Sequence, residues 1–129
     1  MELTVAISCQ SQRRRSNENR LGGTVKSRFR LTGISAPAAG AGNGLWDIAI
    51  TKTDAKPDAW DGKILVPFSP EAELSGVGKA LQPGQFLWYR RTLTLPEIPA
   101  GHRLLLHIGA CDQRAKVFCN GQYVLEHIG

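Results

Sequence analysis

Two adjacent aromatic residues followed by two arginines, Trp88-Tyr89-Arg90-Arg91, form the stretch of this sequence that is best suited to binding chemistry. The rings are large apolar bodies, and the two planar guanidinium groups can each donate several hydrogen bonds to one polar partner. Residues 92–95 alternate threonine with leucine, a pattern typical of a half-buried strand. Two interpretations stay open: a binding strand, or a sandwich strand with buried rings and arginines that are solvated or paired with acids.

The segment that precedes this strand, residues 69–86, is the longest irregular stretch of the sequence. Residues 70–74 could form one helical turn, with Ser69 as its N-cap and acidic residues in the first turn. Glycine and proline then mark turns. A connection of this length inside a compact domain is usually functional or indicates an unrecognised secondary-structure element, so the segment is a second candidate region.

Positive charge is concentrated at one end of the sequence. The 129 residues suffice for one domain and carry a net charge of +5. Residues 1–42 hold seven Lys or Arg against two acids, whereas residues 43–129 hold nine of each sign. We therefore predict a basic leader of low order over residues 1–42 and a domain over residues 43–129. The arginines at 13–15 have no interleaved aromatics, so a solvated tail is favoured over a polyanion-binding arm.

The cysteines predict neither a metal site nor a disulfide framework. Cys9, Cys111 and Cys119 are an odd count, with no CxxC pair and no histidine at ligand spacing. We therefore expect no metal and no cofactor, and we expect Cys111 and Cys119 to pack as small apolar residues. No apolar run is long enough to span a bilayer, so no membrane partner is expected. The first nine residues lack the basic start of a secretory signal, and the compartment stays unassigned.

Strand patterns dominate the rest of the sequence. Residues 44–50 alternate, with Trp46, Ile48 and Ile50 on one face, and residues 103–109 form an apolar run expected to be buried on both faces. Asn120-Gly121 between two alternating runs predicts a hairpin, because both turn positions require positive φ. The predicted strands cover residues 44–50, 63–68, 87–95, 103–109, 115–119 and 122–125, with a possible short strand at 26–31. This spacing predicts an all-β fold, an antiparallel β-sandwich or jelly roll.

Six segments of the sequence, taken together and in order, resemble a known family. They are Asn43-Gly-Leu-Trp-Asp47, Trp60-Asp-Gly-Lys-Ile-Leu-Val-Pro-Phe68, Leu74-Ser-Gly-Val-Gly78, Leu87-Trp-Tyr-Arg-Arg91, Leu106-His-Ile-Gly-Ala110 and Val117-Phe-Cys-Asn-Gly121, followed by His127. The succession is similar to the N-terminal sugar-binding domain of glycoside hydrolase family 2, the group of β-galactosidases, β-glucuronidases and β-mannosidases.

The resemblance implies a jelly-roll domain that precedes an immunoglobulin-like sandwich and a (β/α)₈ barrel. Members of the family hydrolyse β-glycosides with two barrel glutamates that act as acid/base and nucleophile. This sequence shows no barrel, and its glutamates beyond residue 43 lie outside any pattern resembling the catalytic motifs, so no catalytic residue is assigned. The resemblance therefore implies a non-catalytic, carbohydrate-binding-type domain fragment that is inactive by itself.

The resemblance also supplies candidate sugar contacts, at positions matching the family's motifs. An aromatic face would pack on sugar C–H groups, while Arg, Glu or Ser would bond hydroxyls. The candidates are Trp88, Tyr89, Arg90, Arg91, Glu71 and Ser75. The alternative, which we favour for the strand motif, is that the rings are core and the arginines make structural contacts within the domain or to the barrel.

The last residues, 126–129, look like the start of the family's His-x-Gly-Gly segment, so the jelly roll is expected to be incomplete at its C-terminal end. Unpaired sheet edges would then be open to the remaining domains of a glycosidase or to a second copy of the chain. A free-standing carbohydrate-binding module is the alternative function. It needs exposed aromatic residues, so burial of Trp46, Trp60 and Trp88 together would argue against it. A polyanion-binding protein is a weaker alternative, and no nucleic-acid partner is expected.

Overall fold

A computed structural model describes residues 2–10, 30–31, 44–95, 97–103, 105–111 and 114–128. Its strands are β1 (Glu2–Gln10), β2 (Arg30–Leu31), β3 (Gly44–Thr51), β4 (Gly62–Val66), β5 (Phe86–Thr94), β6 (Ile108–Ala110), β7 (Arg114–Cys119) and β8 (Gln122–Ile128). Within the described ranges, the one helical element is a 3₁₀ turn, η1 (Glu73–Ser75). The predicted all-β class is confirmed.

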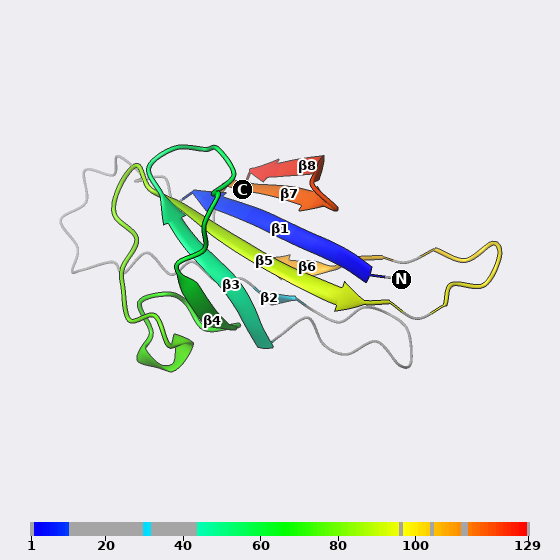
Figure 1. Cartoon of the computed structure of the whole chain (residues 1–129), viewed down its shortest axis with the longest axis horizontal. Helices are drawn as coiled ribbons and strands as arrows, with labels where there is room; N and C mark the ends of the chain where they lie inside the picture. The colour runs from blue at the N-terminus through cyan, green and yellow to red at the C-terminus, as the bar shows by residue number, and fades with distance from the viewer. Residues whose placement is uncertain are drawn as a thin grey trace.

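Six strands form one antiparallel sheet in the order β4-β3-β5-β1-β7-β8, and β2 pairs with β6 in a separate two-stranded sheet. In Figure 1 the small sheet lies behind the large one. Leu106 and Ile108, which lead into and begin β6, pack against the core of the large sheet. This two-layer arrangement is consistent with a β-sandwich or jelly roll.

Strand β1 lies near the middle of the large sheet, between β5 and β7 (Figure 1). Its side chains alternate: Val5, Ile7 and Cys9 belong to the core cluster, while Ser8 faces the other side of the sheet. The expectation of a low-order leader over residues 1–42 is therefore wrong for residues 2–10. The alternation is a period-2 strand pattern, and β5 and β7 supply partners on both sides. Residues 13–15 lie outside the described part of the chain.

The core lies on the face of the large sheet that is turned toward β6. Trp46, Ile48 and Ile50 of β3 share this face as predicted, and Trp46 is fully buried. Buried side chains from β1, β3, β4, β5 and β7 make up its centre: Val5, Ile7, Cys9, Trp46, Ile48, Ile64, Val66, Leu87, Tyr89 and Val117. We call the opposite face of the large sheet the outer face.

The hairpin of β7 and β8 forms around Asn120-Gly121 as predicted, with φ of +50° and +79° at the two turn residues. A register shift at Val117/Phe118 interrupts the pairing. Every residue of β8 is exposed, including Leu125 at 47% and Ile128 at 70%. This hairpin therefore forms one margin of the sheet, and β4 forms the other.

Two local predictions are wrong. The expected strand over residues 103–109 begins only at Ile108, and Leu105 is 57% exposed, so the apolar run is not buried on both faces. The helical turn expected at residues 70–74 is a 3₁₀ turn at Glu73–Ser75, and its N-cap, Ala72, makes no side-chain capping bond. Of the possible strand at 26–31, the structure describes Arg30–Leu31 as β2.

A disulfide joins Cys9 of β1 to Cys111, just after β6. The spacing of the cysteines in the sequence did not reveal this pair, because the two residues are brought together only by the stacking of the two sheets. Cys119 is a free, half-buried cysteine, and burial raises the pKa of its thiol.

Candidate functional site

The two aromatic residues of the predicted binding strand are both buried. Trp88 and Tyr89 are each 1% exposed, and they lie on opposite faces of β5. Tyr89 belongs to the core, whereas Trp88 lies on the outer face with its ring centroid 5.6 Å from that of Phe118. Small residues opposite Trp88, Ala49 on β3 and Ser8 on β1, leave room for the indole. Both rings therefore occupy structural positions, as the structural alternative for this motif anticipated.

A polar connection lies over the outer face near Trp88. Residues 52–61 link β3 to β4, and the Asp54 carboxylate of this loop accepts a hydrogen bond from the Ser8 hydroxyl (3.4 Å) and pairs with Lys116 of β7. Ser8 is the direct neighbour of Trp88 across the β1–β5 pair. These contacts bring the 52–61 connection next to the strand position beside Trp88, on a face that the second sheet does not cover.

Arg90 is held by an acid and a tryptophan. Its Nε and Nη2 donate to Asp47 Oδ2 at 3.0 and 2.8 Å, and its guanidinium carbon lies 4.3 Å from the centroid of the Trp60 ring. Asp47 on β3 lies directly opposite Arg90 on β5 and Lys63 on β4, and it pairs with both cations. Cross-strand register alone therefore assembles this ion-pair cluster on the outer face.

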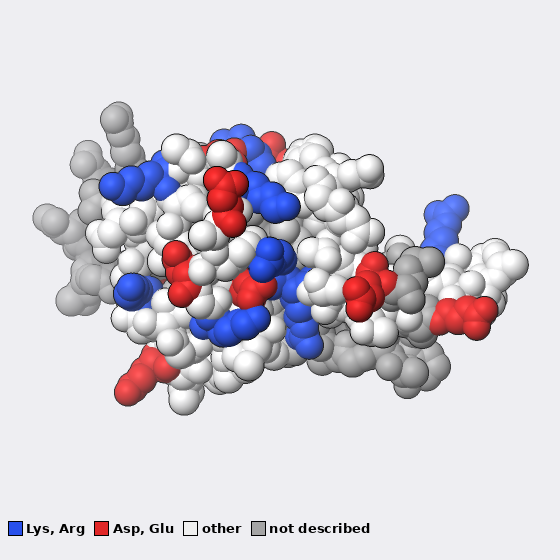
Figure 2. All heavy atoms as spheres, in the orientation of Figure 1, with Lys and Arg blue, Asp and Glu red and all other residues white. Residues whose placement is uncertain are grey.

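The two cations determine the ionisation of Asp47. Partial burial by itself would raise the pKa of its carboxyl group, but hydrogen bonds and charge from Lys63 and Arg90 outweigh that effect and lower the pKa. Figure 2 shows Lys and Arg side chains interspersed with Asp and Glu over the same face, rather than gathered by sign. The described surface in this view therefore has the mixed charges expected of ion pairs, and not the concentrated positive charge expected of a polyanion-binding patch.

Arg91 points to the opposite side of β5 from Arg90. Its guanidinium packs against the backbone of Gly44, where an added Cβ would lie 3.1 Å from Nη1. Gly44 also has a φ of +129°. A larger residue there would therefore adopt an unfavourable backbone conformation and would also crowd the Arg91 guanidinium. Arg91 thus makes a structural contact with the first residue of β3.

The two candidates in the β4–β5 connection have different surroundings. Ser75 is 2% exposed, and its hydroxyl donates to the Ala72 carbonyl (2.7 Å) and accepts the Val77 N–H (3.1 Å). These bonds hold the turn around η1 and leave Ser75 no access to a ligand. Glu71 is half-buried, and its Oε1 is buried with no hydrogen-bond partner in the structure.

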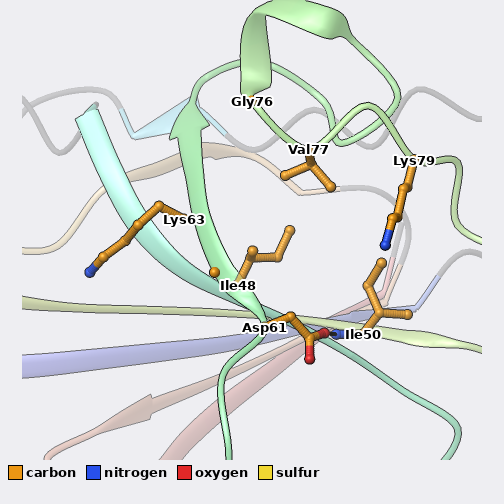
Figure 3. A pocket seen from close by; sticks show the side chains of 8 residues that line it. Ile48, Ile50, Asp61, Lys63, Gly76, Val77 and Lys79 are labelled. Carbon is orange, nitrogen blue, oxygen red and sulfur yellow. Dashed lines mark hydrogen bonds between the residues drawn. The ribbon is translucent and has the colours of Figure 1, made fainter.

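A pocket of about 460 Å³ lies where β4 begins, at the margin of the sheet (Figure 3). The aliphatic side chains of Ile48, Ile50 and Val77 line it, and Figure 3 shows Val77 facing the two isoleucines from the opposite side. The other lining residues are Asp61, Gly62, Lys63, Gly76 and Lys79. The volume falls in the range of small-molecule sites.

Backbone hydrogen bonds fix the two charged residues that face each other across this pocket. The Asp61 N–H donates to the Ile48 carbonyl (2.8 Å), and Asp61 Oδ2 accepts the Ile50 N–H (2.8 Å). On the other side, the Lys79 N–H donates to the Pro70 carbonyl (3.0 Å). The pocket therefore combines aliphatic side chains with one carboxylate held by a hydrogen bond and one lysine whose backbone is held in place.

Parts of three segments of the family resemblance meet in this region. Asp47 comes from the first segment, Asp61 and Lys63 from the second, and Val77 from the third. Lys63 lies between the outer-face ion pairs and the pocket: its ammonium pairs with Asp47, and the residue also belongs to the pocket lining. Sequence reasoning missed Asp47, Asp61 and Lys79 as site residues, although the first two lay inside the quoted segments.

Comparisons of the chain with protein-family models, with curated proteins and with solved structures found no match. Within the described ranges, no group of three or more His, Cys, Asp or Glu side chains is placed to hold a metal ion. No helix among the described residues is long and apolar enough to cross a membrane.

Proposed function

We propose that this chain is a non-catalytic carbohydrate-binding domain of the type that precedes the barrel in family 2 glycoside hydrolases. The observation that carries the proposal is the convergence of separate family-like segments on one pocket, through Asp61 from one segment and Val77 from another. Hydrolysis of β-galactosides or β-glucuronides in such enzymes belongs to the barrel, so this chain's own residues would contribute binding and not chemistry.

The pocket has the mixture of surfaces that a sugar ring requires. The aliphatic side chains of Ile48, Ile50 and Val77 would pack against C–H groups, and Asp61 keeps one carboxylate oxygen beyond its bond to the Ile50 N–H. That oxygen can accept a hydrogen bond from a sugar hydroxyl. The Lys79 ammonium supplies donors on the other side.

Thermal unfolding with and without sugars tests the proposal. The midpoint should rise with at least one methyl β-glycoside, because a ligand that binds only the native state stabilises that state. Val77→Phe should fill the pocket and abolish the rise, whereas Val124→Phe, on exposed β8, should leave it unchanged. If no sugar in a panel of neutral and acidic β-glycosides raises the midpoint, the carbohydrate-binding proposal is wrong.

The non-catalytic part of the proposal needs a separate assay. The purified chain should release no chromophore from nitrophenyl β-galactoside or β-glucuronide. Turnover that disappears in Glu71→Gln would overturn the proposal, because Glu71 is the half-buried carboxylate with an unpartnered oxygen.

A free-standing module with a flat aromatic platform fits the structure less well. Trp46 and Trp88 are buried, and the half-buried Trp60 carries the Arg90 guanidinium over its ring. These three tryptophans therefore do not form an exposed row on which a glycan could stack. The polyanion-binding alternative depends on residues outside the described ranges; salt-independent binding, or binding retained after deletion of residues 11–42, would exclude it.

A further inference from the structure

We infer that the pocket at the start of β4 selects acidic sugars, with the anionic group held by Lys79 and ring hydroxyls held by Asp61. The inference rests on the proposed carbohydrate binding and adds a location and a charge class to it. It concerns a site on the non-catalytic domain, built from Ile48, Ile50 and Val77 together with these two charged residues.

The charged groups at the pocket differ in how far they are engaged by other residues. Lys63 is engaged by Asp47, and Figure 3 shows its side chain extending away from the pocket. Asp61 uses Oδ2 to accept the Ile50 N–H and therefore offers the other oxygen. Lys79 has no carboxylate within 4 Å among the described residues, and its ammonium in Figure 3 is directed over Ile50 into the pocket.

Asp61 and Lys79 are far enough apart to bind two different groups of one ligand. Both residues line the same pocket, but they form no salt bridge, so their charged atoms are more than 4 Å apart. A ligand that donates to the carboxylate at one end and presents an anion to the ammonium at the other would satisfy both groups at once. A sugar bearing a carboxylate or a phosphate has this combination, together with C–H groups that can face the isoleucines.

The surrounding charge favours the same class of ligand. Asp47 is shared between Lys63 and Arg90, so this neighbouring cluster carries one excess positive charge. Lys79 adds a second positive charge, and Asp61 is the one acid among the described residues that line the pocket. An anion in the pocket is therefore attracted by the Lys79 ammonium, and added salt would weaken that attraction.

Titration calorimetry on the whole chain, at low and at high salt, tests the inference. The probes are methyl β-galactoside, methyl β-galacturonide and galactose 6-phosphate, which share a ring and differ in charge. We expect the acidic probes to bind roughly fivefold more tightly than the neutral one. This is the factor by which one favourable exposed ion pair would raise the binding constant. Comparing the affinities of methyl β-galacturonide and galactose 6-phosphate shows whether a carboxylate or a phosphate is the preferred anion.

Variants separate this inference from the proposed function. Lys79→Gln should remove the preference for acidic probes and leave binding of the neutral galactoside unchanged, while Lys56→Gln, an exposed lysine outside the pocket, should change neither. Equal binding of neutral and acidic probes by the unmodified chain would overturn the inference alone. So would an acidic preference that survives Lys79→Gln. Absence of binding by every probe would overturn the inference and the carbohydrate-binding proposal together.

Discussion

Strands β1 and β8 belong to the same antiparallel sheet but have opposite surroundings. β1 has a hydrogen-bonded neighbour on each side and buries Val5 and Ile7 completely. Among the described strands, β8 pairs with β7 alone, and its large apolar residues Leu125 and Ile128 are 47% and 70% exposed. The comparison shows that pairing and burial are separate events: a tight turn is enough to pair a strand, but burial requires partners distant in sequence.

Two isoleucines, one on each strand, give the largest expected contrast. Ile7→Ala should lower the free energy of unfolding by about 2–5 kcal/mol, because it removes a fully buried side chain and leaves a cavity. Ile128→Ala should change it by less than about 0.5 kcal/mol, since that side chain is 70% exposed. Urea unfolding monitored by circular dichroism measures both. Equal losses would contradict the assignment of β1 to the centre and of β8 to the margin.

The Cys9–Cys111 disulfide should account for the next largest effect, because it ties β1 to the segment after β6. Reduction is expected to cost about 2–5 kcal/mol, mainly by freeing the unfolded chain from a long closed loop. Urea unfolding in the presence and absence of a reductant, on a Cys119→Ala background that removes the remaining thiol, measures this cost. A midpoint unaffected by reductant would mean that sheet pairing alone fixes β1.

Asp47 should show a smaller and pH-dependent effect. Asp47→Asn removes two ion pairs on the outer face and should cost about 1–2 kcal/mol near neutral pH. The folded-state pKa of Asp47 is lowered, so its contribution is complete above the unfolded-state pKa of about 4 and is lost as the pH falls through the folded-state pKa. Urea unfolding of both proteins between pH 7 and pH 2 measures the difference. It should shrink toward zero in acid, and a constant gap would argue against a charge effect.

The smallest effect on stability is expected for Leu125→Lys on β8, at less than about 0.5 kcal/mol. The same change should reduce self-association, because an exposed apolar margin strand can pair with another chain and lysine opposes such pairing. Sedimentation velocity over a range of protein concentrations compares the unmodified chain with Leu125→Lys. An unmodified chain that stays monomeric throughout would show that the margin is harmless as it stands.

Local patterns in the sequence predicted much of the fold. The Asn120-Gly121 turn predicted the β7–β8 hairpin, and the alternation around Trp46 predicted β3 and its buried face. The strand β1 was missed although Val5, Ile7 and Cys9 alternate with smaller or polar residues. The period covers few residues, and the basic run at residues 13–15 that follows it is typical of a solvated tail. The run at residues 103–109 was misassigned because an apolar composition without a period does not determine burial.

The candidate site was less predictable than the fold. Trp88 and Tyr89 were proposed from residue type, but a side chain's depth depends on which segments lie over it, and that information is not local. Asp47 could have been inferred, because the predicted strands place it between cations once their register is known. Lys79 could not have been, since its position in the pocket follows from the path of an irregular connection.

The central place of β1 also affects how this chain must fold during synthesis. β1 leaves the ribosome well before its neighbours β5 and β7, which lie far downstream of it in the sequence. The sheet cannot close around β1 until β7 has emerged, and such long-range pairing slows folding. In that interval the apolar face of β1 is exposed and can pair wrongly. A nascent chain stalled before β7 is therefore expected to require a chaperone, whereas the β7–β8 hairpin can form as soon as it is made.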